Sequence, residues 1–222
     1  MPSPSAQPPV APSSPATNRW PSVLAFLATG GLYLALPERL TAGPSWLLLA
    51  IVTVLLVPAL LAWRYGHPRL NFVLGVTLSS VVTAAMIWSL GELLAGLPGK
   101  RQPPTELLRS AVALWLSNIL VFASWYYRLD AGGPHRRELR ESHTDGAFLF
   151  PQMTLPPHIG RSYKDWKPGF VDYLFLAFNT STAFSPTDVP VLSRWAKTLM
   201  MIQSSISLLT IAILAARAIN IL

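Results

Sequence analysis

The chain has 222 residues, 51% of them hydrophobic, with a net charge of +7 and no cysteine. Without cysteine, disulfides, thiolate metal sites and cysteine nucleophiles are excluded. The basic residues flank apolar runs and do not gather on one soluble face. The sequence therefore predicts an integral membrane protein that meets anionic lipid headgroups, and not a nucleic-acid-binding protein.

Residues 1–18 are mostly proline, serine and alanine and carry no charged side chain. We expect a disordered tail, because such a segment has little to bury. The alternative is a signal peptide, since an apolar stretch follows Arg19, but the small-residue cleavage pattern is missing.

Residues 19–104 contain three apolar runs, 20–36, 44–63 and 70–97. At about 1.5 Å per residue, the first is marginal for the roughly 30 Å of a hydrocarbon core and the third exceeds it. We predict a peripheral region of three membrane helices. These runs lack an arginine at every third position, so a voltage sensor is not expected.

A fourth span is predicted at 105–127, with Asn118 in its middle. A buried amide in lipid needs a partner, so Asn118 should face protein and bond another helix; a place in an ion pathway is the alternative. The span ends in Trp125, Tyr126 and Tyr127, which we interpret as an interfacial aromatic belt.

Residues 128–168 form a charged connector with one apolar island, FLFPQM at 148–153, which we expect to dock on the membrane face. The connector holds His135, Glu138, His143 and Asp145, but their spacing matches no established ligand pattern. No metal site is predicted. The chain also lacks a nucleophile motif and a phosphate-binding glycine loop, so neither an enzyme nor a cofactor is expected.

The C-terminal part of the chain begins with an aromatic-rich run at 170–182 that is too short to cross a membrane. A polar segment at 180–188 follows, and then an uncharged run at 198–216 that is long enough to cross. This order predicts a re-entrant loop, in which a half-crossing helix and a polar turn precede a full-crossing helix at 193–222.

The polar segment 180–188, TSTAFSPTD, resembles the filter of potassium channels, which follows the pattern Thr-x-Thr-Thr-Val-Gly-Tyr-Gly-Asp. The proline, Arg194 and long apolar helix after it resemble the inner helix of bacterial two-helix pore modules. The resemblance implies a pore module over 105–222, with an outer helix at 105–127, a pore helix at 170–182 and an inner helix at 193–222, assembled as a tetramer. The order WYY, Asp, GGP, FLFPQM and AFSPTD also resembles an uncharacterised group of bacterial membrane proteins, which brings no established activity.

Three of the departures from the potassium filter decide its chemistry. Ser185 and Thr187 replace its glycines, and Pro186 replaces its tyrosine. Glycine takes positive φ at little cost, whereas proline fixes φ and has no N–H, so a four-site carbonyl filter is not expected. Ions would instead meet rings of hydroxyls and of the Asp188 carboxylate. The predicted pore and filter residues are Thr180, Thr182, Ala183, Phe184, Ser185, Pro186, Thr187 and Asp188.

The same segment also fits a plainer role. Ser185, Pro186 and Asp188 form a helix-start signal, with a serine cap, a proline at the first helical position and an acid three residues on. Asp188 then caps a turn, and the pore-like fold is sealed.

Steps of four and three residues place polar side chains along one face of the final helix. In a symmetric assembly this face would line the axis, closed by Leu214 and with a basic ring of Arg217 at the inner mouth. The alternative has Arg217 reaching the headgroups and the hydroxyls bonding their own helix. The predicted lining residues are Gln203, Ser207, Thr210, Leu214 and Arg217.

These patterns together predict an all-α membrane protein with five transmembrane helices plus a re-entrant pore helix. The expected function is a tetrameric ion-permeation pore that is not potassium-selective, with the bilayer, further copies of the chain and inorganic ions as partners. The alternative is a non-conducting scaffold or regulatory subunit. The pore resemblance puts the N-terminus outside and the C-terminus in the cytoplasm of a bacterial inner membrane. The positive-inside count disagrees, because Arg64, Arg69 and the basic connector would lie outside.

Overall fold

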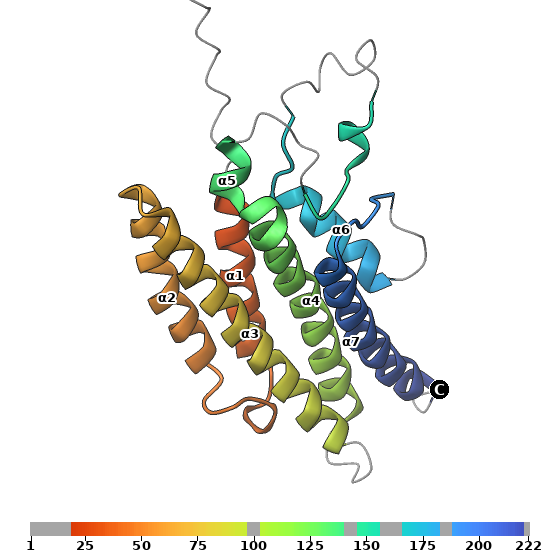
Figure 1. Ribbon diagram of the computed structural model, residues 1–222. Coiled ribbons are helices and arrows are strands. Elements are labelled where there is room, and N and C mark those ends of the chain that lie inside the picture. Colours follow the sequence, from red (N-terminus) through yellow and green to blue (C-terminus); the bar gives the residue numbers. More distant parts are fainter. Residues whose placement is uncertain (1–18, 97–102, 140–145, 156–165, 183–187, 220–222) are drawn as a thin grey trace, which may run out of the picture.

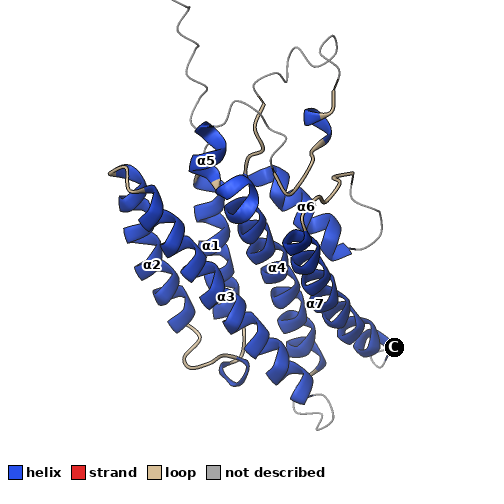
Figure 2. Cartoon of the chain, viewed as in Figure 1, coloured by secondary structure: helices blue, strands red, loops and turns tan. Residues whose placement is uncertain are grey.

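A computed structural model of the chain describes residues 19–96, 103–139, 146–155, 166–182 and 188–219 (Figure 1). Within these ranges the regular structure is helical (Figure 2). The exception is an isolated antiparallel bridge between Phe148 and Val191. The all-α prediction is confirmed for this part of the chain. The predicted tail at 1–18 lies outside the described residues.

Seven α-helices and three 3-10 turns make up the described part. The α-helices are α1 (Trp20–Leu34), α2 (Leu47–Arg64), α3 (Pro68–Gly96), α4 (Pro104–Leu129), α5 (Pro134–Leu139), α6 (Phe170–Thr182) and α7 (Arg194–Ile219). The 3-10 turns are η1 (Glu38–Leu40), η2 (Asp130–Gly132) and η3 (Pro151–Met153).

Four of these segments are long and apolar enough to cross a membrane: Leu47–Arg64, Pro68–Gly96, Thr105–Gly132 and Arg194–Ala216. Helix α1 has 15 residues and is shorter than a full crossing. It stops early because the chain turns extended at Pro37 (φ −60°, ψ 144°). Membrane association is thus supported by four helices, and the predicted fifth span at 20–36 stays a prediction.

Helix α4 is the centre of the bundle. It packs against α1 and α3 on one side and against α6 and α7 on the other, and α2 completes the layer by packing on α1 and α3 (Figure 1). The most apolar stretch of α4 is 67% buried, against 22–28% for the corresponding stretches of α2, α3 and α7. The outer helices therefore leave most of their apolar surface for lipid or for other protein.

The end of α4 that carries Tyr126 and Tyr127 is covered by protein, so the predicted interfacial belt is wrong for these two residues. Both tyrosines are buried, with 0% and 2% of their surface exposed. The apolar island of the connector is also buried: Phe148 packs on Tyr126 with ring centroids 5.2 Å apart, and Phe150 packs on Tyr173 at 5.3 Å. FLFPQM therefore docks on the α4–α6–α7 unit and not on the membrane face.

Candidate functional site

Helix α6 runs beside α4 from the end of α4 towards its middle. At the start of α6, Phe170 and Tyr173 pack edge-on against Tyr127, with ring centroids 5.6 and 5.8 Å apart. At the end of α6, the Ser181 hydroxyl lies 3.4 Å from the Asn118 amide nitrogen. Nine residues of α4 separate Tyr127 from Asn118, which corresponds to roughly 14 Å along its axis. Helix α6 therefore descends about half the length of a membrane-crossing helix.

The start of α6 is fixed locally. The Asp172 side chain reaches back over the first turn, and its carboxylate accepts a hydrogen bond from the Gly169 amide (2.7 Å), as in a capping box. Burial raises the pKa of Asp172, and the hydrogen bond from Gly169 partly offsets that rise. An acid at this position also lies favourably at the positive end of the helix dipole.

After α6 the chain returns to the level at which that helix began. The Leu149 amide donates to the Pro190 carbonyl (3.0 Å), and the Leu192 amide donates to the Ala147 carbonyl (2.8 Å). These bonds flank the bridge between Phe148 and Val191. Because Phe148 packs on Tyr126 and Tyr173, residues 189–192 lie near the first turn of α6 and not near its last.

Gln203 of α7 is the centre of a buried polar core between α4, α6 and α7. Its Oε1 accepts from the Tyr126 hydroxyl (2.5 Å), and its Nε2 donates to the Ala177 carbonyl (2.7 Å) and the Ser181 hydroxyl (2.8 Å). The Asn118 amide donates to the backbone carbonyl of Gln203 (3.2 Å). Asn118 and Gln203 are both fully buried. The prediction that Asn118 bonds another helix is confirmed.

Two serines in the turn of α7 that follows Gln203 cap the C-terminal end of α6 with their hydroxyls. Ser207 donates to the Ser181 carbonyl (2.5 Å) and accepts from the Trp115 indole (3.1 Å), and Ser204 donates to the Thr180 carbonyl (3.2 Å). The last carbonyls of a helix have no partner within it, and lipid offers none. Side chains of α7 therefore satisfy these acceptors where α6 ends inside the bundle.

The structure describes three of the predicted filter residues. Thr180 is buried and donates to the Leu176 carbonyl (2.8 Å), Thr182 is half-buried and donates to the Asn179 carbonyl (3.1 Å), and Asp188 is exposed. The other five predicted filter residues lie outside the described residues: Ala183, Phe184, Ser185, Pro186 and Thr187.

The predicted lining face of α7 lies inside the protomer. Gln203, Ser207 and Thr210 have 0%, 1% and 0% of their surface exposed, and Leu214 is half-buried. Thr210 donates to the Ile206 carbonyl of its own helix (2.8 Å). This agrees with the alternative prediction that hydroxyls of this face bond their own helix. The structure thus brings Gln203 and Ser207 together with α4 and α6, and it does not bring them to the protomer surface. The side chain of Arg217 lies outside the described part.

A second buried cluster, which the sequence analysis did not single out, joins the connector to α4 and α6. The Asp130 carboxylate accepts from the Ala147 amide and from the Tyr173 hydroxyl, both at 2.5 Å. Burial raises the pKa of Tyr173 well above its usual value, so the phenol stays protonated and remains a donor. The Arg137 guanidinium lies over the Tyr127 and Tyr173 rings, 4.9 and 5.0 Å from their centroids. The sequence feature that could have indicated this cluster is DAGGP at 130–134, a turn that brings the connector back onto α4. Its glycines 132 and 133 adopt φ of 78° and 94°.

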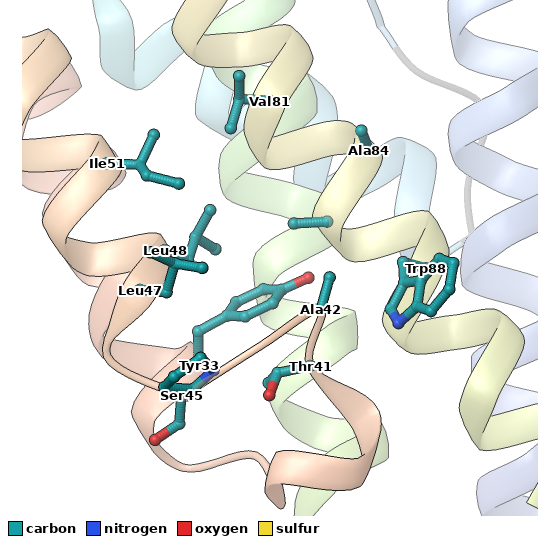
Figure 3. A pocket seen from close by; sticks show the side chains of 12 residues that line it. Tyr33, Thr41, Ala42, Ser45, Leu47, Leu48, Ile51, Val81, Ala84 and Trp88 are labelled. Carbon is teal, nitrogen blue, oxygen red and sulfur yellow. The ribbon is translucent and has the colours of Figure 1, made fainter.

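Among the cavities of the described part, two lie between helices away from the polar core, and both are mostly apolar. One, of about 320 Å³, lies between α1, α2 and α3, with Tyr33 and Trp88 among its lining residues (Figure 3). The Tyr33 hydroxyl there accepts from Ser89 (3.2 Å). The other, of about 750 Å³, lies between α1, α4 and α6 and includes Phe175 and Phe178. Neither lining contains a charged side chain, so neither suits a charged ligand.

Over the described ranges, no group of three or more His, Asp or Glu is placed to hold a metal ion. His143 and Asp145 of the connector lie outside these ranges. Comparison with models of protein families, with curated proteins and with solved structures gave no match.

Proposed function

We propose that the chain is one subunit of a tetrameric ion-permeation pore in a bacterial inner membrane, with α4, α6 and α7 as its outer, pore and inner helices. The observation that carries this proposal is the path of α6. This helix has 13 residues, about 20 Å, which is too short to cross a bilayer. It ends in hydroxyl residues beside the middle of α4, and the chain then returns to the starting level of α6 by Val191. A partial descent and return is the geometry of a re-entrant loop.

A fifth span fits the same proposal. Helix α1 begins at the end of the bundle where α4 ends (Figure 1), and Arg39 beyond α1 pairs with Glu106 at the start of α4. About 22 residues of α4 separate Glu106 from Arg128 in its last turn, which is roughly 33 Å. Helix α1 and the residues up to Arg39 together therefore match the thickness of a hydrocarbon core.

Ion contacts in the proposed pore come from 180–188 and not from the polar face of α7. Since Gln203 and Ser207 are buried within the protomer, they do not reach a shared axis. The opposite face of α7 is exposed and could line a shared axis. Its residues follow one another at steps of four and three: Met201, Ser205, Leu208 and Ala212. That stripe is largely apolar, and an apolar constriction closes a pore by excluding water.

The test is ion flux through the purified full-length protein in planar bilayers. We expect currents in both KCl and NaCl, with little preference for potassium. The fixed φ and missing N–H of Pro186 do not fit the backbone of a carbonyl filter. Asp188→Asn should lower the preference for cations over anions. The control is Glu92→Gln, which removes the same charge from an exposed site on α3, outside the proposed pore module. Silence across several salts and pH values, from protein shown to be folded, would contradict the proposal.

A non-conducting scaffold is the second candidate, and the polar core favours it. The amide and hydroxyl groups of α7 that a water-filled passage would use are engaged inside one protomer. Particle mass in mild detergent separates the candidates, since an axial pore needs four copies. A monomer or dimer would leave the scaffold as the better account.

A further inference from the structure

Two arginines lie at the end of the bundle where α1 begins and α4 ends. Arg19 is the residue before α1, and its guanidinium lies 5.1 Å from the centroid of the Trp63 ring in the last turn of α2. Arg128 belongs to the last turn of α4. The charge of Arg19 acts unfavourably on the charge of Arg128. The fold therefore places two cations at the same end of the bundle.

The guanidinium of Arg128 is seated in a notch of α3. A Cβ built on Gly75 would lie 1.8 Å from Cζ of Arg128 and 1.9 Å from its Nη1, so the arginine fills the space of the missing side chain. Nη1 donates to the Asn71 carbonyl (3.2 Å), and Nε is buried without a hydrogen-bond partner. A guanidinium has five donors, and this neutral carbonyl leaves most of them available.

No carboxylate of the described residues forms an ion pair with Arg128. The acid nearest in sequence, Asp130, already accepts from Ala147 and Tyr173. The ion pair between Arg39 and Glu106 lies at the other end of α4. A partly buried cation without a counter-charge is costly, and the charge of Arg19 adds to that cost. An anion bound at the Arg128 guanidinium would offset this cost.

We propose that Arg128, with Arg19 beside it, binds the phosphate group of an anionic lipid headgroup. Guanidinium groups match phosphate oxygens in geometry and charge. The site lies at the ends of α2 and α4, two of the candidate spans, where headgroups meet the protein. Trp63, 42% exposed beside Arg19, is the kind of residue that marks this level of the bilayer. The site is separate from the proposed ion pathway and does not depend on it.

The test uses the full-length protein in mild detergent, titrated with a short-chain phosphatidylglycerol, with phosphatidylcholine of the same chains, and with sodium phosphate. We expect phosphatidylglycerol to raise the thermal unfolding midpoint and to survive as an adduct in native mass spectrometry. Arg128→Gln should weaken that binding about tenfold or more, since it removes a charge-assisted contact. Arg128→Lys should retain part of the binding, because lysine keeps the positive charge but lacks the paired N–H donors of a guanidinium.

Two further variants keep the outcome decisive. Arg109→Gln removes an exposed arginine near the opposite end of α4 and should leave the affinity unchanged. Arg19→Gln leaves the Gly75 notch intact and should weaken binding even where Arg128→Gln fails to fold. Equal affinity for phosphatidylglycerol in the wild type and in folded Arg128 and Arg19 variants would overturn the proposal. Sodium phosphate that stabilises as strongly as the lipid at equal concentration would overturn the lipid assignment.

Discussion

Gly30 and Gly31 are neighbours in α1 with opposite surroundings. A Cβ at Gly30 would lie 2.8 Å from Cδ1 and 3.2 Å from the backbone Cα of Leu49, whereas nothing lies within 4 Å of one at Gly31. The first glycine lets α1 and α2 approach closely, as small residues do between membrane helices. The second has no such role.

This difference predicts opposite effects of the same substitution. Gly30→Ala should destabilise the protein by about 1–2 kcal/mol, because the added methyl group forces the backbones of α1 and α2 apart. Gly31→Ala should be neutral or stabilising by about 0.5 kcal/mol, because alanine is the better helix former. Thermal unfolding in detergent measures both. Equal effects of the two substitutions would contradict the close approach.

Among the helices, α6 and α7 depend on each other more than their apolar surfaces suggest. Gln203→Leu should destabilise the protein by about 2 kcal/mol or more, because it leaves the buried Tyr126 hydroxyl without its acceptor and removes the bonds to Ala177 and Ser181. The matched control is Ser205→Ala, since Ser205 is exposed on the same helix and bonds only its own turn, at the Met201 carbonyl. Chemical or thermal unfolding in detergent compares the two variants. Equal stability of Gln203→Leu and Ser205→Ala would mean that the polar core makes no net contribution to the free energy of unfolding.

At the scale of helices, much of the fold could be predicted from the sequence. The long spans follow from apolar length, and α6 covers the same residues, 170–182, as the predicted short run. The face that α7 buries could not be predicted. A polar stripe at helical spacing looks the same in sequence whether it meets water, another copy or its own protomer, and Gln203 and Ser207 prove to be bonded within the chain. Tyr126 and Tyr127 were misjudged for a similar reason, because the connector and α6 that cover them are distant in sequence.

For the whole molecule, the two ends of the bundle differ in charge, and this bears on orientation. The connector end includes Arg19, Arg64, Arg69, Arg128 and Arg137. The pore proposal puts this end outside, whereas the positive-inside rule favours the cytoplasm for it. The chain has no cysteine, so single cysteines can report on each end without background.

We predict that Leu139→Cys, exposed at the end of α5, reacts with a membrane-impermeant maleimide on intact cells. Ala42→Cys, exposed between η1 and α2, should react only after the membrane is permeabilised. The two sites lie at opposite ends of α4, because η1 lies beside its start at Glu106 and α5 follows its end. The reverse pattern would put the basic end in the cytoplasm and invert the proposed pore.

The hydroxyl and amide bonds that tie α7 to its neighbours stop at Ser207. Beyond that residue the described contacts of α7 with the bundle are apolar, and residues 194–219 contain neither glycine nor proline at which the helix would bend. If α7 moves, it therefore tilts as one straight rod about the bonds at Gln203, Ser204 and Ser207. The end of the helix near Ile219 would then move furthest.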